Sequence, residues 1–150
     1  MFFKRLMWTD DNVVGLILRL ILGIVFFPHG AQKMLGWFGG GGFAGTMAGM
    51  TKMGLPAAIV FLVILFEFFG SLSLILGFLG RLGAIGIGIV MLGAIFTVHL
   101  PNGFFMNWMG NQKGEGVEYH LLVLGIVLAI LVTGSGRWSV DRSMSNPMPG

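Results

Sequence analysis

An imidazole closes the apolar segment Leu22-Gly23-Ile24-Val25-Phe26-Phe27-Pro28-His29, and this segment decides how the chain is interpreted. Its pattern, Leu-Gly-x-x-Phe-x-x-His, recurs in Leu92-Gly93-Ala94-Ile95-Phe96-Thr97-Val98-His99. A tryptophan in a glycine-containing connection follows each copy, at Trp37 and Trp108. Such self-similarity indicates a duplicated helix-loop-helix unit, and a parallel repeat would hold the two histidines at one depth. Chance recurrence among abundant Leu, Gly and Phe is the alternative.

The composition is that of a membrane protein. Of the 150 residues, 55% are hydrophobic and 10% are charged, and the mean hydropathy is +0.89. Soluble domains carry roughly 25% charged residues. The net charge of +3 is the balance of nine basic and six acidic residues. The basic residues are scattered along the chain and form no basic patch, which argues against nucleic-acid binding. Because the chain has no cysteine, thiol exchange and thiolate-bound iron-sulfur clusters are also excluded.

Four apolar runs predict an all-α fold, a four-transmembrane-helix up-down bundle that fills residues 1–150 as a single domain. The predicted spans are residues 13–34, 56–79, 82–100 and 117–132. The first run is too long for a secretory signal, contains Arg19 and lacks a cleavage site, so we expect it to be retained. The third run has small residues four positions apart, at Ala84 and Gly88 and again at Gly93 and Thr97. This spacing lets helices approach closely. We expect the C-terminal tail to be loose.

The connections predict how the bundle sits in a bilayer. Residues 43–53 have apolar side chains at helical spacing and predict a helix lying flat on the membrane. Counted outside the spans, basic residues favour cytoplasmic termini. One side has Lys4, Arg5, Arg81, Arg137 and Arg142, and the other has Lys33, Lys52 and Lys113. The same topology places tryptophans at both interfaces, with Trp8 and Trp138 at one and Trp37 and Trp108 at the other. We therefore predict a multi-pass protein of the cytoplasmic (inner) membrane.

Two ionisable residues lie deep inside predicted spans, where each costs roughly 2.5 to 3.5 kcal/mol on insertion scales. At 1.5 Å per residue, Arg19 lies about 9 Å from the inner end of its span and Glu67 about 17 Å from the outer end of its own. Their heights differ by about 5 Å on this count, which predicts an Arg19–Glu67 ion pair. The pair could be a structural brace. Alternatively, Glu67 could be a catalytic, proton-handling group whose charge Arg19 stabilises.

A second polar group gathers at the outer ends of three predicted spans. It comprises His29, Gln32 and Lys33 on the first, His99 at the end of the third, and Glu118, Tyr119 and His120 at the start of the fourth. An up-down bundle brings these ends together, which predicts a pocket. For His120 we favour an ordinary interfacial imidazole bonded to a loop carbonyl. His29 and His99 are stronger site candidates because they match in the apparent repeat.

Three chemistries fit such a pocket. A quinone head group needs hydrogen-bonding partners and aromatic walls, and its isoprenoid tail needs access to lipid. His29, His99, Gln32 and Glu118 are candidate partners, and Phe26, Phe27, Phe104 and Phe105 are candidate walls. A haem could be ligated by His29 and His99. A metal ion could be held by His29, His99 and Glu118, although no ligand spacing singles out either of these two alternatives.

Short motifs follow one another along most of the chain: Arg19-x-x-x-Gly23, Phe27-Pro28-His29-Gly30-Ala31-Gln32-Lys33, Gly36-Trp37-Phe38-Gly39, Gly54-Leu55-Pro56, Glu67-Phe68-Phe69-Gly70, Leu76-Gly77-x-x-x-Arg81, Ala94-Ile95-Phe96-Thr97-Val98-His99, Asn102-Gly103-Phe104-Phe105 and Gly116-Val117-Glu118-Tyr119. In these motifs the chain resembles the DoxX family of small four-helix bacterial and archaeal membrane proteins. The resemblance implies a cytoplasmic-membrane bundle. The family takes its name from the small subunit of an archaeal thiosulfate:quinone oxidoreductase, which favours the quinone interpretation. The family has no agreed catalytic residue, so the resemblance identifies none in this sequence.

The leading hypothesis is a redox-associated membrane subunit with a quinone-type pocket near its outer face. His29 and His99 would be hydrogen-bond or proton partners of the head group, and Glu118 and Gln32 would orient it. Lys33, Tyr119, Phe104 and Phe105 complete the expected binding set. The expected partners are membrane lipid, a quinone, and a redox protein or further copies of the chain. The alternatives are a non-catalytic scaffold for soluble redox enzymes, a haem- or metal-binding bundle and a small-solute carrier, although no span is visibly interrupted as in many carriers.

Overall fold

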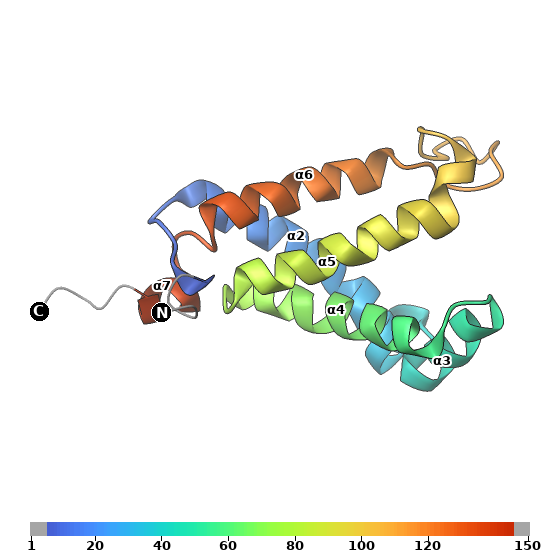
Figure 1. Ribbon diagram of the computed structural model, residues 1–150, viewed down its shortest axis with the longest axis horizontal. Coiled ribbons are helices and arrows are strands. Elements are labelled where there is room, and N and C mark those ends of the chain that lie inside the picture. Colours follow the sequence, from blue (N-terminus) through green and yellow to red (C-terminus); the bar gives the residue numbers. More distant parts are fainter. Residues whose placement is uncertain (1–5, 146–150) are drawn as a thin grey trace, which may run out of the picture.

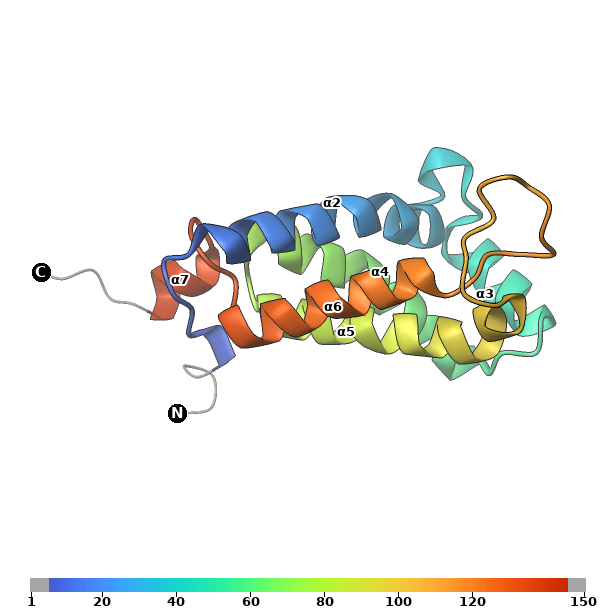
Figure 2. The ribbon, with the colours of Figure 1, turned by 90° about the horizontal axis from the view of Figure 1, so that it is seen from above.

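The computed structural model describes residues 6–145 and consists of helices and their connections. Four long helices run antiparallel and form one bundle (Figures 1 and 2). In chain order the elements are α2 (Val13–Leu35), η1 (Trp37–Gly39), α3 (Gly42–Lys52), α4 (Ala57–Leu76), α5 (Gly80–Ala94), η2 (Ile95–His99), η3 (Leu100–Asn102), α6 (Glu118–Thr133) and α7 (Val140–Ser145). The short helix α7 lies at one end of the bundle and α3 at the other, and we name the two ends after them (Figure 1).

The predicted four-helix membrane bundle is confirmed. Val13–Leu35, Ala57–Leu76 and Gly80–Asn102 are long and apolar enough to cross a membrane. The apolar helix α6 has 16 residues and is shorter. The side chain of Asn12 caps the first turn of α2 by accepting a hydrogen bond from Gly15 N. Pro28 lies inside α2 without ending it.

The four helices form a ring in which each packs against the next in the chain and α6 closes against α2. Glycines allow the closest contacts. A Cβ at Gly30 of α2 would come within 2.6 Å of the Phe68 backbone, and one at Gly83 of α5 within 2.9 Å of the Gly70 carbonyl. Gly88 likewise packs against Val127. Of the small residues predicted to line helix contacts, Ala84 and Gly88 are buried, whereas Gly93 and Thr97 are exposed.

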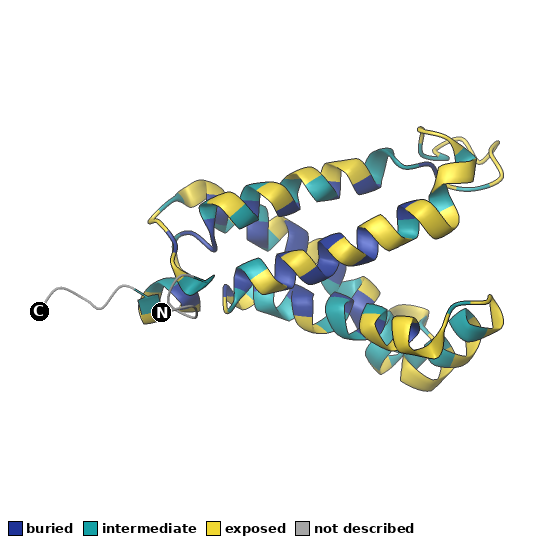
Figure 3. Ribbon diagram, viewed as in Figure 1, coloured by how far each residue is buried: buried dark blue, intermediate teal, exposed yellow. Residues whose placement is uncertain are grey.

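Apolar side chains fill the middle of the ring and also cover its outside. The core comprises Leu22, Phe26, Leu74, Ala84, Ile87, Val90, Met91, Val123, Val127 and Ile130. Exposed and buried positions alternate along α5 and α6 with the helical period (Figure 3). Large apolar residues such as Leu122 and Val132 are exposed, as expected for surfaces that face lipid.

The predicted Arg19–Glu67 ion pair is wrong. Arg19 is 2% exposed, and its guanidinium donates only to backbone carbonyls among the described residues. The acceptors are the carbonyls of Leu74, Ile75, Ser135, Arg137 and Trp138, at 2.7 to 3.3 Å. Leu74 and Ile75 belong to the last turn of α4, whose carbonyls have no partner within the helix. Arg19 therefore ties the end of α4 to the segment after α6.

The prediction of a loose C-terminal tail is also wrong for the residues up to Ser145. Residues 146–150 lie outside the described part of the chain. After α6 the chain folds back, and Asp141 of α7 is 1% exposed. Its carboxylate accepts from the backbone N–H groups of Leu79 and Gly80 at 2.7 and 3.0 Å. An acceptor at this position satisfies orphan donors at the start of α5. The tail thus closes the α7 end of the bundle.

The α3 end carries the two long connections. A helix, α3, is present where the sequence predicted one lying flat on the membrane, and none of its residues is buried. Trp37 and Trp108 belong to these connections and are 54% and 83% exposed, while Trp8 and Trp138 flank the opposite end and are 50% and 80% exposed. Exposed tryptophans at both ends suit the two interfaces of a bilayer. Lys4 and Arg5, which were counted for orientation, lie outside the described residues.

Candidate functional site

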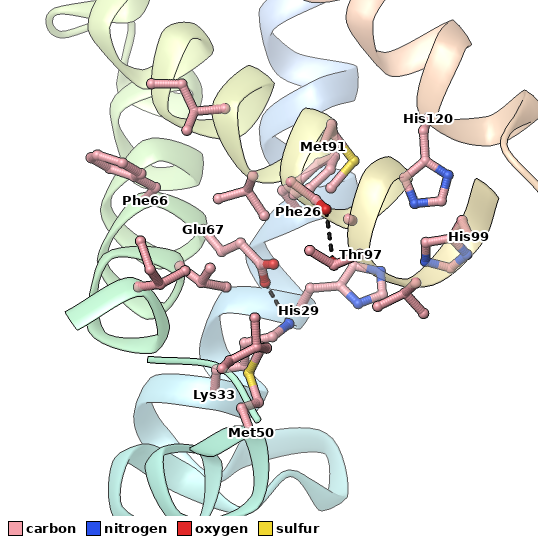
Figure 4. Close-up of a pocket in the computed structure, with 18 of the residues that line it drawn as sticks. Phe26, His29, Lys33, Met50, Phe66, Glu67, Met91, Thr97, His99 and His120 are labelled. Atoms are coloured by element: carbon pink, nitrogen blue, oxygen red, sulfur yellow. Dashed lines mark hydrogen bonds and ion pairs between the residues drawn. The ribbon is translucent and has the colours of Figure 1, made fainter. Parts of the chain in front are cut away.

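A cavity of about 510 Å³ lies between the four helices in the half nearest α3. Ligand sites usually have volumes of roughly 300 to 1,000 Å³, apolar walls and a few polar groups. The polar residues that line this cavity are His29, Lys33, Glu67, Thr97, His99, Glu115, Tyr119 and His120. In Figure 4 the polar side chains converge from α2, α4, η2 and α6; those labelled are His29, Lys33, Glu67, Thr97, His99 and His120. The predicted pocket is therefore present at the expected end of the bundle.

On one side of the cavity, Lys33 of α2 and Glu67 of α4 form an ion pair with an Nζ–Oε2 distance of 2.5 Å. The side chain of Glu67 is 7% exposed and that of Lys33 is 25% exposed. Gly30 brings α2 against the backbone of Glu67 and Phe68, which places the lysine one turn further along the helix beside the carboxylate. Lys33 therefore presents a cation to the cavity while its charge is balanced.

On another side, His99 and His120 pair with ring centroids 4.1 Å apart. The Nδ1 atom of His99 lies 2.8 Å from the carbonyl oxygen of Glu115. A carbonyl only accepts, so Nδ1 of His99 carries a proton, and the neutral ring has its lone pair at Nε2. His120 is 5% exposed. The backbone of Gly116 lies near its ring, yet its buried Nδ1 has no hydrogen-bond partner within the described chain.

A π-helical turn positions His99. The α-helical part of α5 ends at Ala94, and Ile95–His99 form the wider turn η2. Such turns are rare and frequently occur at functional sites. The hydroxyl of Thr97 in this turn donates to the carbonyl of Gly93 in α5 at 2.8 Å. The segment directs both Thr97 and His99 toward the cavity (Figure 4).

His29 occupies the margin of the cavity. Its side chain is exposed, although it is one of the lining residues. Its ring lies 6.1 Å from that of Phe26, measured between centroids. The sequence-predicted residues that the structure brings into the cavity are His29, Lys33, Glu67, His99 and Tyr119. They come from all four long segments, as an up-down bundle requires.

The other predicted binding residues lie outside the cavity. Gln32 donates to the carbonyl of Phe38 at 3.2 Å. Glu118 accepts from the backbone of Met106 at 2.8 Å and from Trp108 Nε1 at 3.3 Å. These two side chains order the connections rather than the site. Of the aromatic walls, Phe27 lies between Trp37 and Phe68, Phe104 and Phe105 contact each other, and only Phe26 lines the cavity.

The geometry argues against the predicted metal site and leaves the predicted haem ligation as a prediction. Within residues 6–145, no three His, Cys, Asp or Glu side chains are arranged to hold a metal ion. The proposed set of His29, His99 and Glu118 is therefore not assembled. Haem ligation by the two histidines stays a prediction. Sequence reasoning gave His120 an ordinary role and missed Glu115 and Thr97, because the π-helical turn and the connection that place them have no hydrophobic periodicity.

The model of the DoxX family matches residues 14–100, more than half of the chain. The chain belongs to the DoxX family. The matched region of this DoxX protein includes Lys33, Glu67 and His99, whereas His120 lies beyond it.

Curated relatives support the assignment over nearly the whole chain. The inner membrane protein YqjF of Escherichia coli is 31% identical, over 90% of this chain and 95% of that protein. The "Putative oxidoreductase CatD" of Bacillus subtilis is 33% identical, over 84% of this chain and 83% of that protein. An uncharacterised membrane protein of Mycobacterium tuberculosis, Rv3486, is 30% identical over 95% of this chain and 88% of that protein. No solved structure matches the chain significantly.

Proposed function

We propose that this DoxX protein is a redox-associated membrane subunit that binds the head group of a quinone in its cavity. One observation carries the proposal: an apolar-walled cavity of about 510 Å³ in which the Lys33–Glu67 pair and the His99–His120 pair form separate polar sides. A quinone head group is a flat ring with two carbonyl acceptors on opposite edges. Two separate polar sides suit such a ligand better than a single polar corner would.

Each pair has a definite role in this proposal. The Lys33 ammonium has three N–H groups, so it can donate to a quinone carbonyl while it keeps its bond to Glu67. At the opposite carbonyl, a ring N–H of His120 supplies the hydrogen bond. The Nδ1–H of His99 faces the Glu115 carbonyl, so the neutral His99 ring offers only its Nε2 lone pair, which can accept from the hydroxyl of the reduced head group.

The electrons in this proposal pass to or from a partner protein. The chain has no cysteine, so it has no dithiol of its own to oxidise. A relative bears the name "Putative oxidoreductase CatD", which supports a role in redox metabolism. We further propose that the chain resides in the cytoplasmic membrane with both termini in the cytoplasm, since Arg81, Arg137 and Arg142 belong to the α7 end.

Titration of the purified full-length protein with ubiquinone analogues tests the proposal. Lys33→Met and His120→Ala are each expected to weaken binding about tenfold or more, as loss of a hydrogen bond to a buried ligand group would. Lys52→Met removes an exposed lysine of α3 and is the control. If the wild-type protein does not bind, or if both site variants bind as well as wild type, the non-catalytic scaffold becomes the better explanation.

An absorbance spectrum near the Soret band and metal analysis of the same sample test the haem and metal alternatives.

A further inference from the structure

The helices α4 and α5 pack tightly near α7 and separate toward α3. Near the turn that joins them, a Cβ on Gly83 would come within 2.9 Å of the Gly70 carbonyl. One turn further along, Gly86 packs against the ring of Phe66, with a Cβ distance of 3.0 Å. At Gly93 a Cβ would meet nothing within 4 Å. Figure 1 shows the two ribbons diverging in this direction.

The cavity reaches this divergence. Ile59 and Leu62 of α4 and Ile89 of α5 all line it, and they are 46%, 41% and 53% exposed. Ile89, Gly93 and Thr97 are spaced four residues apart, so they share one face of this segment, and all three are lining residues that are exposed. The cavity is therefore not sealed between the outer halves of α4 and α5.

Polarity is divided between the sides of the cavity. Apart from Glu67, the lining residues of α4 are Ile59, Leu62, Val63 and Phe66. The polar lining residues come mostly from α2, η2 and α6. At the α3 end, Met50, Leu55 and Met106 cover the cavity with apolar side chains. A fully polar ligand gains no binding free energy at the α4–α5 side, whereas a ligand with an apolar chain gains it by burying that chain there.

We infer that the natural ligand carries a long apolar chain and that this chain lies in the opening between α4 and α5, continuous with the bilayer. This inference rests on the proposed quinone site and names the class of quinone that fits it, one with an isoprenoid or alkyl tail. The ligand enters from the membrane, with its head group directed at the two polar pairs. The opening is thus a lateral portal lined by Ile59, Leu62, Ile89 and Gly93.

Equilibrium binding of two probes in lipid nanodiscs tests the portal. The probes are a tail-less dimethoxy-methyl-benzoquinone and the same head group with a decyl chain. Ile89→Trp fills the portal and is expected to weaken binding of the decyl probe about tenfold or more while changing that of the tail-less probe less than about twofold. Leu92→Trp is the matched control, because Leu92 is 46% exposed on the same helix but does not line the cavity.

The outcomes separate the two ideas. If wild-type protein binds both probes and Ile89→Trp affects them equally or not at all, the portal is disproved and the quinone site stands. If neither probe binds wild-type protein, the quinone site and the portal both fail. If Ile89→Trp changes the number of chains per particle while Leu92→Trp does not, the opening is covered by a second copy and the portal inference is overturned. Thermal melting of each variant checks that it is folded.

Discussion

At the scale of single residues, the buried charges are balanced differently from the sequence-based prediction. Lys33 pairs with Glu67, whereas Arg19 lies 14 residues earlier on α2, about 21 Å along the helix. The prediction assumed that neighbouring spans end at one height. In fact α2 extends two residues beyond Lys33, about 3 Å, while α4 extends ten residues beyond Glu67 on the same side, about 15 Å. This stagger gives Glu67 a lysine as its partner.

A double-mutant cycle distinguishes the two pairings. Lys33→Met and Glu67→Gln are expected to couple by about 1 kcal/mol or more, because the groups are in contact and Glu67 is nearly buried. Arg19→Met and Glu67→Gln are expected to add within about 0.5 kcal/mol, as distant residues do. Reversible unfolding in mixed micelles measures both cycles. Strong coupling of Arg19 to Glu67 together with none for Lys33 would restore the original pairing.

Arg19 itself is expected to be a major determinant of stability. Its guanidinium satisfies five carbonyls, and Lys cannot reproduce the planar fork that reaches them. Arg19→Lys should therefore cost about 2 kcal/mol or more, since several buried acceptors lose their donor. Arg137→Lys is the control. Its pair with Asp11 is about two-fifths exposed on both sides, and such pairs contribute roughly 0 to 1 kcal/mol. Equal losses in the two variants would contradict the assigned role.

At the scale of elements, hydropathy was sufficient to predict the helices. The expected span at residues 13–34 is α2, and that at 117–132 is α6, each within one residue at either end. The third span differs, because its last turns are η2 and η3 rather than α-helix. An apolar run has the same hydropathy in either geometry, so no pattern distinguished them. The pairing of His99 with His120 depends on this turn and was missed with it.

Glycine positions allow a prediction about individual helices. Gly30→Ala should destabilise the bundle by about 1 to 3 kcal/mol, because the new Cβ would meet the backbone of α4 at 2.6 Å and force the two helices apart. The same displacement should weaken the Lys33–Glu67 pair. Gly49→Ala in α3 has open space around the new Cβ and should stabilise that helix by about 0.5 to 1 kcal/mol. Thermal unfolding of both variants checks the opposite signs, and destabilisation by both would contradict the packing.

At the scale of the whole molecule, architecture was more predictable than the closure of its ends. Counting apolar runs was enough to predict four antiparallel crossings, since each span must satisfy its backbone internally and cross once. The α7 end was not predictable in the same way. It depends on Asp141 reaching the first turn of α5 across 61 residues of chain, and one carboxylate in a polar tail has no distinctive pattern. The shape of the cavity likewise follows from helix stagger and divergence.

The orientation of the molecule is testable because the chain has no cysteine. Met109→Cys places a thiol in the connection before α6, where the side chain is 86% exposed, and Met144→Cys places one in α7, where it is 55% exposed. With both termini in the cytoplasm, a membrane-impermeant maleimide added to spheroplasts should label Cys at 109 and should label Cys at 144 only after permeabilisation. The reverse pattern would place the cavity end in the cytoplasm, so that the polar pairs would exchange protons with that compartment.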